Sequence, residues 1–374
     1  MNTDWIKNFN KEEFIGPFVI DKDCDYEAAM ISKITAFLKI LKPNLDKDTY
    51  SSLQYFSENV MHTVHLVYEG RADEAQAFIQ ECFEDFENGE ISFVTANSCP
   101  AFYGYKPDKE YEIQFFRARM GEDFCAYNKQ DMFHVPFNMR GKVETTRFSI
   151  PGLPCLYLSN TSYGCWVELG KPQDDKLSVS PVVVDNEVKV LNLAVSIFDI
   201  FEFVDLKICD SDDDWNKKFC EYSKLMVLMI ASSFVVLEKD RKFKSEYIIS
   251  QMVMLAIKDN GYDGVVYYSK KTASDLYSRV SVNLALYATF DPGKDVLYSS
   301  CLSKRVFIGN SYNFALYQHL NGVNLMNSYR LAIDGMNGRV IIGDSGKYYL
   351  YRNTLFHDFD AHIFSGWKNR EHPL

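Results

Sequence analysis

The sequence contains no CxxC pair, although it has nine cysteines among its 374 residues. Oxidised frameworks and zinc sites are usually built on short paired spacings, and an odd count leaves at least one cysteine without a partner. The scattered cysteines therefore predict reduced thiols in a cytoplasmic protein without a resident metal.

Long hydrophobic runs are also missing. The longest, residues 225–236, contains two serines and is far shorter than the roughly 20 apolar residues of a membrane-spanning helix. The N-terminal stretch MNTDWIKNFNKEE is too polar for a secretory signal peptide. We expect no membrane association and a cytoplasmic location.

Positive charge is scarce. The chain has 40 Lys and Arg against 51 Asp and Glu, a formal net charge of −11, and no long basic run. A general affinity for nucleic-acid phosphates is therefore not expected. Single arginines can still bind a small anionic ligand.

Apolar and aromatic residues are abundant. They make up 47% and 15% of the chain, which argues against disorder, and 374 residues suffice for one large or two ordinary domains. We expect a compact, well-ordered protein.

The first part of the chain has helical periodicity. Apolar residues recur at helical spacing over residues 25–41, again from Leu53 to Val67 before Gly70, and from Ala75 to Phe86 before Asn88-Gly89. These three amphipathic segments predict a helical N-terminal region over residues 1–105.

The remainder, residues 106–374, alternates short strands with helices. Strands are expected in EIQFFRAR (residues 112–119), within 177–193, and over 264–268 and 282–287, with helices after the acidic triplet 212–214 and over 245–258. Beyond Pro292 we expect a β-rich extension, with a strand over 329–333 and a hairpin turning at 344–346. The pattern predicts an α+β fold.

The segment HDFDAH near the C-terminus places acidic and imidazole groups at alternating positions. On a strand, Asp358, Asp360 and His362 would share one face. A metal site is disfavoured, because exposed strand faces are commonly polar and no fourth ligand is indicated.

The stretch from Arg147 to Glu168, RFSIPGLPCLYLSNTSYGCWVE, contains the largest number of candidate functional groups within a short span. Two prolines and a glycine force a turn before a short strand that contains Tyr157. Asn160 or Ser162 can cap a following helical turn over residues 163–169, which would carry Glu168 on a rigid element. Nearby Cys165 is expected to be a small buried hydrophobic residue.

Residue types alone leave the roles of these groups open. An arginine such as Arg117 or Arg147 can bind a phosphate through its planar fork or form a structural ion pair. Glu168 fits an exposed position on an amphipathic helix as well as a functional acid. Tyr157 fits a core position, and Ser269 fits a turn.

Three segments together resemble the RES domain family, named for its arginine, glutamate and serine. They are FFRAR at residues 115–119, the stretch 147–168, and GYDGVVYYS at residues 261–269. The resemblance covers roughly residues 111–287 and places a catalytic core over 111–290. It implies an ADP-ribosyltransferase-like mixed β core and cleavage of the nicotinamide–ribose bond of NAD, with NAD as substrate and no other cofactor.

The resemblance assigns six residues. The family's arginines fall on Arg117, preceded here by Phe116 where the family has tyrosine, and on Arg147, followed here by Phe148-Ser149. Its tyrosine, glutamate, serine and asparagine fall on Tyr157, Glu168, Ser269 and Asn283.

The implied roles follow from the chemistry of the bond. Glu168 would stabilise positive charge on the ribose. Arg117 and Arg147 would hold the pyrophosphate, Tyr157 would line the nicotinamide pocket, and Ser269 would orient the ribose or the glutamate.

The acceptor stays open. Water would give hydrolysis and inorganic phosphate would give phosphorolysis, and the resemblance implies a growth-arresting toxin with an antitoxin or regulatory protein as partner. The alternatives are an ADP-ribosyltransferase that modifies a host protein, and a non-catalytic module that binds a nucleotide or a partner.

Overall fold

The computed structural model describes residues 11–21, 24–84, 86, 89–103, 115–206, 211–237, 241–271, 280–291, 296–320, 340–342, 348–351, 354–365 and 367. The chain divides into two compact units, and each is built from separated segments. Unit 1 contains residues 1–94, 146–149 and 189–265, and unit 2 contains residues 95–145, 150–188 and 266–374. The sequence boundary at residue 105 stays a prediction about domain organisation.

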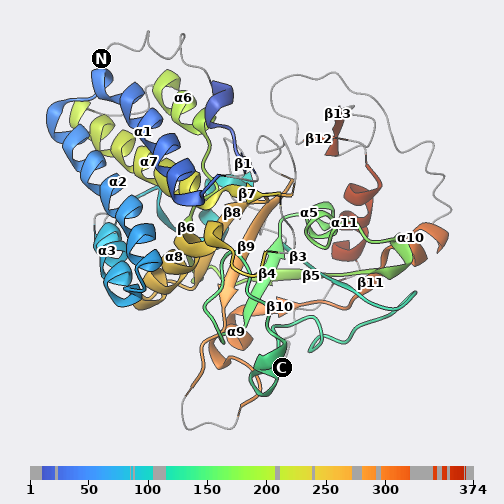
Figure 1. Ribbon diagram of the computed structural model, residues 1–374. Helices are drawn as coiled ribbons and strands as arrows, with labels where there is room; N and C mark the ends of the chain where they lie inside the picture. Colours follow the sequence, from blue (N-terminus) through green and yellow to red (C-terminus); the bar gives the residue numbers. More distant parts are fainter. Residues whose placement is uncertain are drawn as a thin grey trace. The chain divides into compact units, whose positions relative to one another are not determined.

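Unit 1 is mainly helical (Figure 1). Its α-helices are α1 (Tyr26–Leu41), α2 (Lys47–Tyr68), α3 (Ala72–Glu84), α6 (Ile197–Leu206), α7 (Asp212–Ser232) and α8 (Ile248–Asp259). Contacts join α2 to α3 and α7, and α3 to α8. The three predicted N-terminal helices are confirmed, although α3 ends earlier than the sequence suggested.

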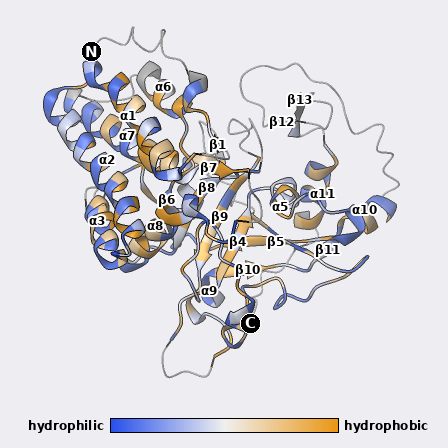
Figure 2. Cartoon of the chain, in the orientation of Figure 1, coloured by the Kyte–Doolittle hydropathy of each residue, from blue (hydrophilic) through white to orange (hydrophobic). Residues whose placement is uncertain are grey.

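The helices α1 and α2 start at aspartates. Asp25 accepts hydrogen bonds from two backbone N–H groups of α1, and Asp46 does the same for α2. These carboxylates satisfy donors that have no partner inside a helix. The buried faces of both helices carry the apolar residues of the predicted periodicity, and Figure 2 shows both helices combining hydrophobic and hydrophilic residues.

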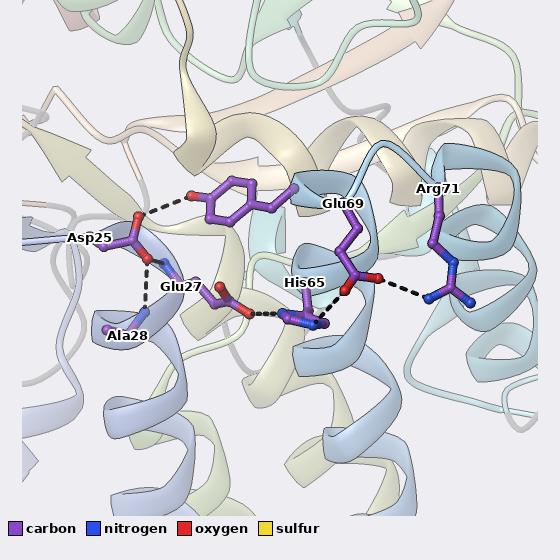
Figure 3. A network of polar contacts seen from close by, with 7 residues as sticks. Asp25, Glu27, Ala28, His65, Glu69 and Arg71 are labelled. Atoms are coloured by element: carbon purple, nitrogen blue, oxygen red, sulfur yellow. Dashed lines mark hydrogen bonds and ion pairs between the residues drawn. The ribbon is translucent and has the colours of Figure 1, made fainter.

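A surface network of charged groups links α1, α2 and the turn that precedes α3 (Figure 3). The ring of His65 on α2 lies 3.2 Å from a carboxylate oxygen of Glu27 on α1 and 3.3 Å from one of Glu69. Arg71 pairs with Glu69 at 2.8 Å and with Glu74 on α3 at 2.5 Å. Hydrogen bonds from Arg71 hold the pKa of both Glu69 and Glu74 below its usual value.

Short strands complete unit 1. The strand β1 (Phe18–Ile20) pairs in parallel with β7 (Phe234–Val236). The strand β6 (Lys189–Asn192) lies between β8 (Gly264–Tyr268) and β2 (Phe93–Thr95), both of which cross a unit boundary.

A buried glutamate fixes the segment that leads to β2. Glu221 of α7 accepts at one oxygen from the N–H of Ile91, the N–H of Ser92 and the hydroxyl of Ser92, at 3.0, 2.7 and 2.6 Å. Three protein donors therefore share one carboxylate oxygen in the interior of unit 1.

Unit 2 is built on a sheet. Its strands follow the order β10 (Val306–Ile308), β5 (Leu177–Val184), β3 (Phe115–Met120), β4 (Cys155–Ser159), β9 (Val282–Tyr287), β8, with β11 (Tyr312–Asn313) also beside β5. The strand β3 pairs with β5 along its whole length, but it pairs with β4 only at Phe116↔Ser159. All these pairings of β3, and that of β4 with β9, are antiparallel.

Helices cover one face of this sheet. Phe116 and Ala118 of β3 form a buried cluster with Cys165 of α5 (Ser162–Glu168), with Phe314 of α10 (Phe314–Leu320), and with Phe359 of α11 (Leu355–Ser365). Unit 2 also contains α4 (Pro100–Tyr103) and α9 (Ser300–Arg305). The predicted α+β fold is confirmed.

The C-terminal part differs from its prediction. The two strands of the expected hairpin pair, with β12 (Val340–Ile342) antiparallel to β13 (Tyr348–Leu350), but its turn at 344–346 and the expected strand at 329–333 lie outside the described residues. The segment HDFDAH is part of helix α11, so the prediction of a strand was wrong. Leu355, Phe359 and Ile363, spaced four apart, are buried on one side of this helix, and this packing overrides the polar alternation.

Candidate active site

The short helix α5 carries Glu168 as its last residue. Its N-cap is Thr161, which has extended backbone angles and accepts a hydrogen bond from the N–H of Gly164 at 2.9 Å. The predicted caps were therefore wrong, because Ser162 already lies inside the helix and the cap is the extended residue that precedes it. A Cβ on Gly164 would lie 2.1 Å from Oγ of Ser159 and 3.1 Å from the backbone oxygen of Val280, so glycine favours the close packing of α5 on β4.

Helix α5 is held at both its start and its middle. The N–H of Ser162 donates to the buried carboxylate of Asp360 at 3.2 Å, and the hydroxyl of Tyr351 donates to the other oxygen of Asp360 at 2.5 Å. The thiol of Cys165 donates to the carbonyl of Phe116 at 3.2 Å, and burial raises its pKa to about 12. Cys165 is thus a buried neutral thiol, as predicted.

The carboxylate of Glu168 has two different neighbours. Nδ2 of Asn283 on β9 donates to Oε1 of Glu168 at 2.6 Å. Nζ of Lys271 lies 4.0 Å from Oε2 and also donates to the backbone carbonyl of Glu168. The Glu168 side chain is 35% exposed; Asn283 holds one of its oxygens, and the other lies beside the half-exposed ammonium of Lys271.

Ser269 is connected to this group through Lys271. The N–H of Lys271 donates to Oγ of Ser269 at 3.2 Å, and the N–H of Ser269 donates to the carbonyl of Ser281 at 3.0 Å. Ser269 is almost completely buried. It fixes the backbone from which Lys271 reaches Glu168.

Tyr157 lies on the same face of the sheet as Asn283. Ser159 pairs with Asn283 and Tyr157 pairs with Ala285, and directly paired residues point to one face. Since Asn283 holds Glu168, the ring of Tyr157 is directed to the face of the sheet on which α5 packs.

Arg117 points to the other face. Its neighbours Phe116 and Ala118 pack in the cluster with α5, so alternation directs Arg117 away from that helix. Its Nη1 donates to the carbonyl of Tyr157 at 2.9 Å, where β3 and β4 are not paired. Burial lowers the pKa of Arg117 to about 10, which leaves it cationic at neutral pH. Its Nε has no hydrogen-bond partner among the described residues.

Arg147 belongs to unit 1. Its guanidinium is largely buried, donates to the hydroxyls of Ser232 and Ser233 at 3.4 and 3.2 Å, and stacks over the ring of Phe148 at 4.8 Å. Unit 2 thus brings together Glu168, Asn283 and, through Lys271, Ser269. Arg117 contacts the carbonyl of Tyr157 in unit 2, and Arg147 contacts two serines of unit 1.

Lys271 was missed by the sequence analysis. It lies two residues after Ser269, but its contacts with Glu168 span 103 positions of the chain. The only local signal was a pair of lysines directly after Ser269.

A buried histidine in unit 2 is not part of this group. Nε2 of His134 accepts from the N–H of Ser299 at 2.9 Å, and Nδ1 contacts the carbonyl of Val135 at 2.8 Å. This arrangement fits the neutral ring with its proton on Nδ1. Burial lowers the pKa of His134 to about 4.

The described residues contain neither a metal-binding cluster nor a membrane-spanning helix. Within them, no group of three or more His, Cys, Asp or Glu side chains is arranged to hold a metal ion. In the same part of the chain, no helix is both long enough and apolar enough to cross a membrane.

Comparisons with known proteins give one clear sequence relative. The chain is 29% identical over 276 residues to "Putative toxin YopC" of Bacillus subtilis (strain 168), which covers 68% of this chain. The chain spans 60% of the length of that relative. No protein-family model matches.

One solved structure has low similarity to the fold. It is the crystal structure of the M. tuberculosis MbcT–MbcA toxin–antitoxin complex, at 14% identity and a TM-score of 0.26, covering 57% of this chain and 91% of the matched chain.

Proposed function

We propose that the chain degrades NAD by cleaving the bond between nicotinamide and ribose, and that Glu168 is its catalytic carboxylate. The observation that supports this most directly is the fixed geometry of Glu168. Asn283 holds one of its oxygens at 2.6 Å, and the side chain is still partly exposed, so its second oxygen can reach a substrate.

Cleavage of the bond between nicotinamide and ribose requires a carboxylate beside the ribose. The bond between C1′ of the ribose and N1 of the pyridinium breaks, and its electron pair neutralises the pyridinium as nicotinamide leaves. Positive charge then develops on the ribose ring, as in glycoside hydrolysis, and an anionic group near the ribose stabilises it. Addition of water at C1′ with release of a proton gives ADP-ribose; addition of inorganic phosphate gives the phosphorylated sugar.

The remaining residues orient Glu168, line the substrate site or hold the strand beside it. Asn283 orients Glu168, and Tyr157, on the same sheet face, lines the place of the nicotinamide ring. Arg117 holds β4 through the carbonyl of Tyr157 and keeps a cation beside the strand. Binding of the pyrophosphate by Arg117 and Arg147, as the RES resemblance implies, stays a prediction.

The biological role proposed is that of a growth-arresting toxin. It is supported by the RES resemblance and by the similarity to a protein named as a putative toxin. Because the chain spans 60% of that relative, the relative's whole activity is not transferred to it. An antitoxin that binds the chain and blocks the site is the corresponding proposed partner.

The test compares the purified wild-type chain with Glu168→Gln and with a matched control, Glu187→Gln, which changes an exposed glutamate of unit 2. We expect wild type and control to release nicotinamide from NAD, and Glu168→Gln to be slower by at least about 10²-fold. Chromatography of the products with and without inorganic phosphate identifies the acceptor.

Two results would contradict the proposal. NAD that stays intact with the wild type, with and without phosphate, removes the degrading activity. Label from NAD that appears on a polypeptide, with little free ADP-ribose, favours the ADP-ribosyltransferase instead.

A further inference from the structure

Lys271 places a positive charge beside the second carboxylate oxygen of Glu168. It lies three residues after the end of β8, and its backbone N–H donates to Oγ of the buried Ser269. Its ammonium bonds the last carbonyl of helix α5 and lies 4.0 Å from Oε2 of Glu168. Lysine is favourable here, because the C-terminus of a helix carries partial negative charge.

The ion pair with Glu168 is loose. The side chain of Lys271 is 54% exposed, and exposed pairs at this distance contribute little to stability. The long, flexible stem allows the ammonium to leave Glu168 for another anion nearby while the backbone stays anchored at Ser269.

The position of this cation conflicts with the proposed chemistry unless an anion accompanies it. A positive charge close to Glu168 weakens the stabilisation of a cationic ribose by that carboxylate. An anionic group of the substrate that binds the ammonium removes the conflict and frees Oε2 for the ribose hydroxyls.

We propose that Lys271 is a specificity-determining residue that binds the phosphate carried by the ribose of the substrate. The site then selects phosphate-bearing nicotinamide nucleotides over the neutral-sugar nucleoside, which contains the same scissile bond. This inference rests on the proposed function and deepens it.

The experiment measures kcat/KM for NAD and for nicotinamide riboside, which lacks phosphate. The variants are Lys271→Met, Lys271→Arg and the control Lys176→Met. Lys176 is another lysine of unit 2; its side chain is 43% exposed and lies 3.9 Å from a carboxylate. We expect Lys271→Met to lower kcat/KM for NAD by tenfold to a hundredfold, on the order expected for a charge-assisted hydrogen bond. For Lys271→Met, kcat/KM for nicotinamide riboside should be unchanged or higher. Lys271→Arg should keep most of the preference for NAD over nicotinamide riboside.

An equal fall for both substrates would overturn the inference, because it would mean that Lys271 only supports α5. Unchanged kinetics for both would overturn it as well. Lys176→Met should resemble the wild type in either case.

A binding measurement separates this inference from the proposed function. Titration calorimetry with ADP-ribose and with adenosine requires no turnover. We expect Lys271→Met to weaken ADP-ribose by about tenfold or more and to leave adenosine unchanged. Equal affinity of wild type and Lys271→Met for ADP-ribose, or no binding to the wild type, refutes the role of Lys271 even if NAD is cleaved. If the wild type binds ADP-ribose more tightly than Lys271→Met does but leaves NAD intact, only the proposed NAD cleavage is refuted.

Discussion

Replacing Asn283 by leucine, which has a similar shape and no polar atoms, should lower activity far more than stability. Asn283 is 2% exposed, and its Nδ2 donates to Glu168 while its Oδ1 has no hydrogen-bond partner among the described residues. The amide orientation is set by the carboxylate, which accepts and cannot donate when ionised.

The change in the free energy of unfolding is the sum of two opposing contributions. Loss of the charge-assisted hydrogen bond costs about 1.5–3 kcal/mol, reduced here because Glu168 is 35% exposed and water can replace the donor. Removal of the buried, unsatisfied Oδ1 raises the free energy of unfolding by about 1–3 kcal/mol. We therefore expect the free energy of unfolding to change by about 1 kcal/mol or less, while kcat falls by about tenfold to a hundredfold because Glu168 is no longer oriented.

Thermal denaturation and NAD cleavage should be measured on the same preparations. A shift in Tm of more than about 5 °C would show that the amide has a structural role that the contacts do not explain. Activity equal to that of the wild type would show that orientation of Glu168 by Asn283 is not needed. The reasoning fails in either case.

Three further changes test other parts of the structure. Glu221→Ala leaves three donors of Ile91 and Ser92 without their acceptor and should lower the free energy of unfolding by about 3 kcal/mol in denaturant titrations, with Glu221→Gln milder. His134 has a pKa of about 4 when folded and about 6.5 when unfolded, so the unfolded chain binds more protons between these values. Stability should fall by roughly 3 kcal/mol as the pH drops from 6.5 to 4, and His134→Gln should reduce this fall; an unchanged pH profile would refute the assignment. Gly164→Ala places a Cβ 2.1 Å from Oγ of Ser159, so it should displace α5 and lower NAD cleavage, and unaltered activity would show that α5 tolerates the shift.

Local patterns predicted the elements well where a single periodicity dominates. The helices α1 and α2 and the strands β8 and β9 lie where the apolar spacing placed them. The segment around Asp360 was mistaken for a strand, because a six-residue alternation of polar groups fits both periods and only packing of the apolar neighbours decides between them. The cap at Thr161 was missed because three adjacent capping residues, Asn160 to Ser162, differ only in their backbone angles.

The candidate site was predictable only in part. Glu168 and Asn283 were proposed through the RES resemblance, and their contact across 115 positions could not be read from either segment alone. The same limit explains the omission of Lys271. Arg117 shows a related limit. Its strand was predicted from the sequence, but the sheet face to which its side chain points follows only from the pairing of β3 with the neighbouring strands.

The interleaved course of the chain sets an order for folding during synthesis. The helices α2 and α3 leave the ribosome early, but their partners α7 and α8 follow more than a hundred residues later. At 5–20 residues per second, apolar faces of the first helices stay uncovered for on the order of ten seconds. The last group of the site, Asn283, is added after unit 1 has been completed at residue 265. A nascent chain thus has a period in which helper proteins can bind the uncovered helices before any assembled site exists.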